Sequence, residues 1–126
     1  MIDRPQFAER LARVEADLLA LEWSVLRILS EDEYRHDMNA VVSALKIRGS
    51  EMQQRVTQLQ VDALGPLALR RYLREEMSAT NPAALDNLPA YTVGASSQFL
   101  FQRAATIYGG AREVQKNIIA KAAFGL

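Results

Sequence analysis

The chain has 126 residues, 49% hydrophobic and 24% charged, which is enough for one folded domain with a single core. Its 15 basic residues balance 15 acidic ones, which argues against nucleic-acid or anionic-membrane partners, because both select for excess positive charge. It has no cysteine and one histidine, His36, which excludes disulfides, zinc–thiolate or iron–sulfur sites and a histidine metal cluster. With no apolar run near the roughly 18–20 residues of a membrane span and no secretory signal, we expect a soluble, cytoplasmic protein.

The first predicted element is a long amphipathic helix over residues 5–29. Its hydrophobic residues recur at alternating steps of four and three, which is the spacing of one helical face. They are Phe7, Leu11, Val14, Leu18, Leu21, Val25 and Ile28. Pro5 suits the first turn of such a helix.

A second helix is predicted over residues 36–64, after a polar break, and it ends at Gly65-Pro66. Two such helices joined by a short polar link predict an antiparallel hairpin. Gly49 lies within the second apolar stripe, where it costs about 1 kcal/mol of helix propensity. We expect a neighbouring helix to approach its backbone closely, with contact to a bound cofactor as the alternative. The stripe comprises Met38, Val42, Leu45, Gly49, Met52, Val56, Leu59 and Ala63.

Residues 66–90 are predicted to be irregular, because Pro82 and Pro89 interrupt any helical pattern. Three arginines there (Arg70, Arg71 and Arg74) fit either a phosphate site or, with the two glutamates that follow, a solvated ion-pair surface. The third and fourth helices are predicted over residues 91–108 and 110–124. The whole chain, 1–126, is therefore predicted to be a single all-α domain, an antiparallel up-down four-helix bundle.

Paired glycines, Gly109 and Gly110, separate the last two predicted helices. A helix that follows Gly-Gly presents bare backbone N–H groups at its positive end, where a phosphate or an oxyanion can bind. An ordinary tight turn is the alternative interpretation. Tyr108, just before the pair, would line a pocket in the first case and pack at a helix end in the second.

The residues around this glycine pair form the most specific pattern in the chain. They read Tyr108-Gly109-Gly110-Ala111-Arg112-Glu113-Val114-Gln115-Lys116-Asn117-Ile118-Ile119-Ala120. This string resembles the C-terminal signature of the FAD-dependent acyl-CoA dehydrogenases, whose C-terminal domain is a bundle of long antiparallel helices. Looser similarities cover the rest of the chain. Residues 7–12 and 44–51 are similar to the family's first and second bundle helices, and 62–66 falls where the family usually has a Gln-x-x-Gly-Gly turn that reaches the flavin.

The resemblance implies removal of an α-proton and a β-hydride from an acyl-CoA thioester, giving the 2-enoyl-CoA and reduced FAD. Many members carry the catalytic carboxylate at the position of Gly109, so we expect no catalytic residue in this chain. Glu22 and Glu113 are the remaining candidate bases, but neither occupies the family's position. By resemblance, the substrate-facing residues are Tyr108, Gly109 and Gly110. The flavin-facing residues are Ala111, Arg112, Glu113, Asp62 and Gly65, although Ala111 lacks the usual threonine hydroxyl and Asp62 replaces the usual glutamine.

Two functions are compatible with this pattern. In the first, the chain is the C-terminal domain of an acyl-CoA dehydrogenase and contributes the flavin- and thioester-facing turn and oligomer contacts. It is then inactive alone, because the family's other two domains hold most of the FAD and acyl-CoA. Its partners would be those domains or further copies of itself. In the second, it is a non-catalytic helical-bundle module of the same ancestry, which pairs with itself or with a partner.

Overall fold

The computed structural model describes residues 3–30, 38–70 and 90–125, and every regular element in these ranges is helical. Helix α1 spans Pro5–Ser30 and α2 spans Met38–Leu64, against the expected 5–29 and 36–64. They are followed by the 3-10 helices η1 (Gly65–Leu69) and η3 (Ala90–Thr92), then α4 (Ala95–Phe101), η4 (Gln102–Thr106) and α5 (Arg112–Phe124). The prediction of an all-α fold with four α-helices is confirmed for the described residues.

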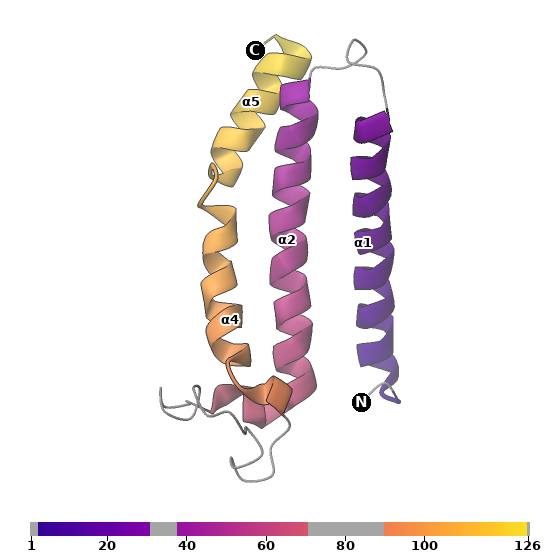
Figure 1. The fold of residues 1–126 in the computed structure, drawn as a ribbon, viewed down its shortest axis with the longest axis vertical. Coiled ribbons are helices and arrows are strands. Elements are labelled where there is room, and N and C mark those ends of the chain that lie inside the picture. Colours follow the sequence, from indigo (N-terminus) through magenta and orange to yellow (C-terminus); the bar gives the residue numbers. More distant parts are fainter. Residues whose placement is uncertain (1–2, 31–37, 71–89, 126) are drawn as a thin grey trace.

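The helices form three parallel columns, with α2 in the middle (Figure 1). Helix α1 runs antiparallel to α2 on one side, and α4, η4 and α5 follow one another along the other side, also antiparallel to α2. The third and fourth helices therefore share one column. No described helix is both long and apolar enough to cross a membrane.

Two ion pairs set the register of α1 against α2. Arg10 contacts Asp62 at 2.5 Å, and Asp17 pairs with Arg55. In both pairs the residue numbers sum to 72, as expected for two antiparallel helices in which one step forward on α1 matches one step back on α2. All four side chains are at least one-quarter exposed, so each pair contributes at most about 1 kcal/mol.

The third predicted helix, 91–108, is shorter and more irregular than expected. Gly94 adopts a left-handed conformation (φ 81°) directly before α4, which interrupts the helix there. Beyond Phe101 the chain tightens into η4, where the side-chain amide of Gln54 donates to the carbonyls of Gln102 (3.1 Å) and Arg103 (3.3 Å). These bonds engage carbonyls that would otherwise serve a continuing α-helix.

The fourth helix begins at Arg112 rather than at 110 or 111, because Gly110 has a φ of 99° that no α-helix accommodates. It ends at Phe124, where Gly125 takes the left-handed conformation (φ 68°) and its N–H bonds the carbonyl of Lys121 at 3.1 Å.

The core is thin, and α2 supplies half of the described buried residues. Ser43, Ser50 and Thr57, seven residues apart, are buried, and Met52 and Leu59 are buried as well. The Ser50 and Thr57 hydroxyls donate to carbonyls of their own helix (2.5 and 3.0 Å), so these buried polar groups are satisfied. Helix α1 contributes no buried residue. Trp23, Leu100 and Phe101 are 66–69% exposed.

The expectation of a close neighbour at Gly49 is wrong for this chain. A Cβ built on Gly49 would meet no atom within 4 Å. The apolar stripe on which Gly49 lies is not covered there, because the third column packs on the Ser43–Ser50–Thr57 side of α2. The expected phosphate or ion-pair role of the arginine trio falls largely outside the described residues, since Arg71 and Arg74 lie in 71–89.

Candidate functional site

The glycine pair forms a tight corner between η4 and α5. The N–H groups of Ile107 and Tyr108 both donate to the carbonyl of Ala104, at 2.9 and 3.0 Å, and close η4. Gly109 (φ 68°) and Gly110 (φ 99°) then turn the chain through the left-handed region, which only glycine enters at low cost. A corner of this shape requires the Gly-Gly pair that the sequence carries.

The N-terminus of α5 is left open by this corner. Ala111 is the N-cap residue and makes no side-chain capping bond to the first turn of the helix. Gly109 is exposed and Gly110 and Ala111 are half-buried, and their N–H groups donate to no other described residue. Unpaired donors therefore gather at the positive end of a 13-residue helix.

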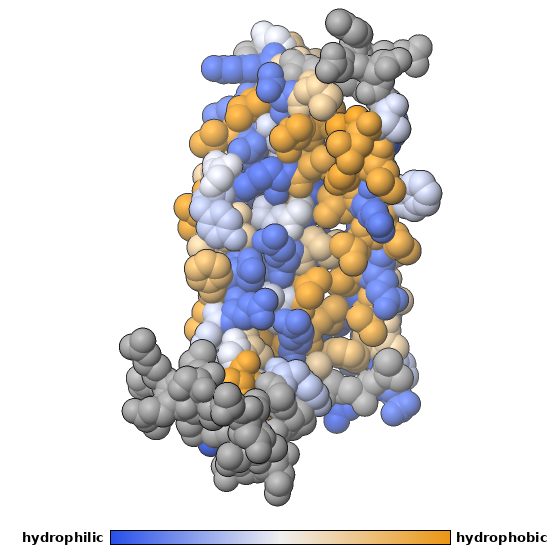
Figure 2. Space-filling model, in the orientation of Figure 1, coloured by the Kyte–Doolittle hydropathy of each residue, from blue (hydrophilic) through white to orange (hydrophobic). Residues whose placement is uncertain are grey.

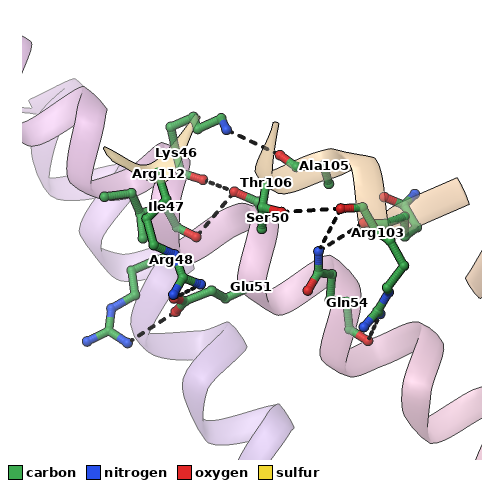
Figure 3. A network of polar contacts seen from close by, with 11 residues as sticks. Lys46, Ile47, Arg48, Ser50, Glu51, Gln54, Arg103, Ala105, Thr106 and Arg112 are labelled. Carbon is green, nitrogen blue, oxygen red and sulfur yellow. Dashed lines mark hydrogen bonds and ion pairs between the residues drawn. The ribbon is translucent and has the colours of Figure 1, made fainter. Parts of the chain in front are cut away.

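Two side chains engage the corner's carbonyl groups. Lys46 of α2 donates from Nζ to the carbonyls of Gly110 (2.6 Å) and Ala105 (3.2 Å), and Figure 3 shows its contact with Ala105. Gln115 of α5, which is buried, donates from Nε2 to the carbonyl of Gly109 at 3.2 Å. These side chains already occupy the carbonyl groups of Gly109 and Gly110. The backbone N–H groups of the corner are therefore the polar atoms that remain available to a ligand.

A second contact ties the start of α5 to α2. The Arg112 guanidinium lies 2.7 Å from the Glu51 carboxylate, and Arg48 approaches the same carboxylate at 3.6 Å (Figure 3). Lys46 lies five residues before Glu51 on α2. It forms no ion pair with any carboxylate in the described part of the chain. Its positive charge therefore adds to the field of the open helix end instead of being neutralised locally.

The structure brings five of the sequence-predicted site residues together at this corner, namely Tyr108, Gly109, Gly110, Ala111 and Arg112. The Tyr108 side chain is 50% exposed. Glu113 follows in the first turn of α5 with an exposed side chain, and Glu22 on α1 is exposed as well, so neither carboxylate has the burial expected of a catalytic base.

The other two predicted flavin contacts, Asp62 and Gly65, lie at the far end of α2. Sixteen residues separate Asp62 from Lys46, which is about 24 Å along the helix. The Asp62 carboxylate accepts hydrogen bonds from Arg10 (2.5 Å) and Gln58 (2.9 Å). The negative charge of Asp62 is therefore already paired with a cation.

Sequence reasoning did not assign Lys46, Glu51 and Gln115 to the site. Lys46 and Glu51 lie in the segment 44–51, which resembles the family's second bundle helix, but the sequence predicted no site residue in that segment. Gln115 lies inside the C-terminal signature itself. The two similar segments thus meet in space, although 64 positions separate Lys46 from Gly110.

Two grooves lie beside α1 and α2, and the second reaches Arg112 next to the corner. One, of about 610 Å³, runs between α1 and α2 and is lined by apolar side chains such as Leu21, Ile28 and Leu45. The other, of about 880 Å³, is polar, and its lining includes five arginines: Arg10, Arg13, Arg55, Arg103 and Arg112. Neither lining includes the glycine pair. Among the described residues there is no group of three or more histidine, cysteine or acidic side chains that could hold a metal ion.

Comparison with known proteins identifies the family. The family model described as "Acyl-CoA dehydrogenase, C-terminal domain" matches residues 1–124. No curated protein and no solved structure matches the chain significantly. The match covers nearly the whole sequence and includes the corner, the segment 44–51 and both long helices. The chain therefore belongs to the acyl-CoA dehydrogenase family, and its helices correspond to the C-terminal domain of that family.

Proposed function

We propose that this chain serves as the helical C-terminal domain of an FAD-dependent acyl-CoA dehydrogenase and presents the Gly109-Gly110 corner to the flavin and the acyl thioester. The observation that supports this role is the open end of α5. Its unpaired N–H groups, and a Lys46 ammonium that no described carboxylate neutralises, suit a negatively charged group or a developing oxyanion.

The reaction explains what the corner would contribute. The α-proton of a thioester is weakly acidic, so its removal needs donors on the carbonyl oxygen that stabilise the enolate-like charge. In this proposal the Gly109 N–H would act as such a donor, whereas a glycine cannot accept the proton. Bound FAD would supply the acceptor for the β-hydride. The base and most of the flavin and substrate contacts would then come from protein segments other than these 126 residues.

The flavin-facing set would divide between two positions along α2. Ala111, Arg112 and Glu113 follow the corner beside Lys46, whereas Asp62 and Gly65 lie at the C-terminal end of α2, about 24 Å from Lys46 by helix rise. One compact ligand group cannot touch both positions. We infer that each position meets a different part of the cofactor, or a different copy of it, and that homo-oligomer contacts are part of the domain's role.

The pure 126-residue chain is expected to have no dehydrogenase activity, because Gly109 stands at the usual base position. The measurement is reduction of an electron-acceptor dye with an acyl-CoA and added FAD. Turnover above the protein-free background would contradict the proposal.

Flavin binding tests the corner directly. We expect the full chain to quench FAD fluorescence on titration, and Lys46→Met to weaken binding because it removes the ammonium behind Gly110. Lys116→Met is the matched control, since Lys116 is an exposed lysine of α5. Equal binding by both variants would remove Lys46 from the site, and absence of any flavin signal would favour the second candidate function.

That second function is a non-catalytic module of the same ancestry that pairs with itself or a partner. The specific observation in its favour is the exposed apolar surface of α1, which has no buried residue. A colourless preparation of stable dimers, with no flavin absorbance, is the result expected of this module.

A further inference from the structure

The two grooves beside α1 and α2 are parts of one continuous trough. Their linings share Asp17, Glu51 and Arg55, so the grooves meet at the Asp17–Arg55 ion pair. On α2 the lining residues run from Met38 to Leu59, which is about 32 Å by helix rise. Figure 2 shows hydrophobic residues gathered over α1 and along its boundary with α2. We call the groove of about 610 Å³ the apolar half of the trough and the groove of about 880 Å³ its arginine half.

The apolar half has the size and the lining of a site for a hydrocarbon chain. Its volume lies within the range of small-molecule sites in proteins. From Met38 to Met52 it extends about 21 Å along α2, which is long enough for one extended chain. Two arginines, Arg27 and Arg48, line it as well. Burial of a chain against the hydrophobic side chains would be favourable, because it removes apolar surface from water. These side chains are Ala20, Leu21, Ile28, Met38, Val41, Ala44, Leu45 and Met52.

The arginine half carries an excess of positive charge in its lining. Five arginines line it against two carboxylates, those of Asp17 and Glu51. Two of the five arginines pair with carboxylates outside the lining, Arg10 with Asp62 and Arg13 with Glu9. Within the groove, positive side chains therefore outnumber negative ones, which favours an anionic ligand. The five are Arg10, Arg13, Arg55, Arg103 and Arg112.

Arg103 is the arginine of this half that pairs with no carboxylate in the described part of the chain. Its guanidinium donates to the backbone carbonyls of Phe99 (3.3 Å) and Gln54 (3.1 Å) and lies 4.4 Å from the centre of the Phe99 ring. A guanidinium has five N–H groups, so Arg103 keeps donors for a ligand. Guanidinium groups bind phosphate with two parallel hydrogen bonds, which makes phosphate the group that such a lining suits best.

We propose that the trough binds a single-chain amphiphile with a compact phosphate head group, such as a lysophospholipid with a phosphate monoester. The chain lies in the apolar half and the phosphate in the arginine half. A phosphate monoester carries a charge of about −1.5 to −2 and three acceptor oxygens, whereas the head group of a fatty acid carries one charge. The net charge of the chain is zero, so the attraction is local to the groove and does not extend to an anionic membrane surface.

This site goes beyond the proposed function, because neither half of the trough is lined by the glycine pair or by Lys46. Arg112 is the residue next to the corner that the arginine half includes. The FAD titration tests the corner through Lys46, whereas the trough is tested through residues of its own lining. Failure of one proposal is therefore distinguishable from failure of the other.

The test is a calorimetric titration of the full 126-residue chain with monododecyl phosphate, below its critical micelle concentration. We expect saturable binding of one molecule per chain. Dodecyl maltoside has the same chain with a neutral head, and inorganic phosphate has the head without a chain. Each reaches only one half of the trough, so each should bind at least about tenfold more weakly. Dodecanoate, with one negative charge, should also bind more weakly than the phosphate.

Variants test the two halves separately. Ala44→Trp fills the apolar half from an exposed position, and Arg103→Gln removes the unpaired guanidinium from the arginine half. Each should weaken binding of monododecyl phosphate by about tenfold. Ala12→Trp and Lys116→Gln are the matched controls, because both residues are exposed and line neither half. Their affinity should equal that of the wild type.

Arg13→Gln keeps the test valid if Arg103→Gln disturbs the third column, because Arg13 is exposed and contacts only Glu9 of its own helix. Equal affinity for dodecyl maltoside, or unchanged affinity in both arginine variants, would overturn the assignment of the head group. Unchanged affinity in Ala44→Trp would overturn that of the chain. Binding of dodecanoyl-CoA without binding of monododecyl phosphate, or binding to anionic vesicles alone, would overturn the proposal as a whole.

Discussion

At the scale of single residues, the corner depends on three chemically different contacts. Glycine supplies the backbone conformation at 109 and 110, the Lys46 ammonium holds the carbonyl of Gly110, and the Gln115 amide holds that of Gly109. A Cβ on Gly110 would stand 2.3 Å from the Gln115 Nε2, so the second glycine also makes room for the amide. The conformation of the corner is therefore fixed by side-chain hydrogen bonds as well as by the freedom of glycine to adopt a positive φ.

Gly110→Ala is expected to destabilise the fold by about 1–3 kcal/mol, because alanine is strained at φ 99° and must displace the buried Gln115 side chain. Thermal or urea unfolding followed by circular dichroism measures the change. Gly125→Ala is the matched control: it shares a positive φ (68°), but its Cβ would meet nothing within 4 Å, so a smaller loss is expected. Equal losses would show that the Gln115 contact has no role.

At the scale of elements, α2 and α1 differ in how they are held. The middle helix packs on both neighbours and carries the buried Ser43, Ser50 and Thr57 as well as Met52 and Leu59. By contrast, α1 has no buried residue and is joined to α2 by half-buried apolar contacts and two exposed ion pairs. Since opening free energy follows local burial, the two helices should differ in local stability.

Hydrogen exchange should therefore be faster for the amides of α1 than for those of α2. Mass spectrometry of peptides from the two helices, with α5 as an internal reference, gives the comparison. Equal protection of α1 and α2 in the monomer would contradict this view of the hairpin.

At the scale of the whole molecule, one layer of helices must stabilise a domain with few buried residues. The described core consists mainly of small or medium side chains, namely Met52, Leu59, Ala68, Ala95 and Ala105. Helices of this kind gain most of their stability from burial of an apolar face. Association should therefore contribute a large share of the stability of the folded chain.

The unfolding temperature is expected to rise with protein concentration, because the self-association proposed above would draw the equilibrium toward the folded state by mass action. Calorimetry or circular dichroism over a wide concentration range measures it. A concentration-independent midpoint for the wild type would show that the single layer is stable by itself.

The spacing of residues close together in the chain was sufficient to predict several features of the fold. Spacing in steps of three and four indicated α1 and α2 to within about two residues, and the C-terminal signature indicated the family and the corner residues. The change to a 3-10 helix after Phe101 was not predicted, because the Gln54 side chain that bonds the carbonyls of Gln102 and Arg103 comes from α2, far away in the chain. The open space at Gly49 was not predicted either, since it depends on which face of α2 the third column covers.

The sequence by itself determined the helical class, the two long helices, the Gly-Gly corner and the membership of the family, because periodicity and glycine conformation are properties of neighbouring residues. Only the tertiary structure decided that Lys46 and Glu51 hold the corner, that Asp62 stands at the opposite end of α2 in an ion pair with Arg10, and that α1 buries no residue. These facts depend on the register and rotation of one helix against another. Many residues far apart in the chain contribute to those quantities together, and no short motif contains them.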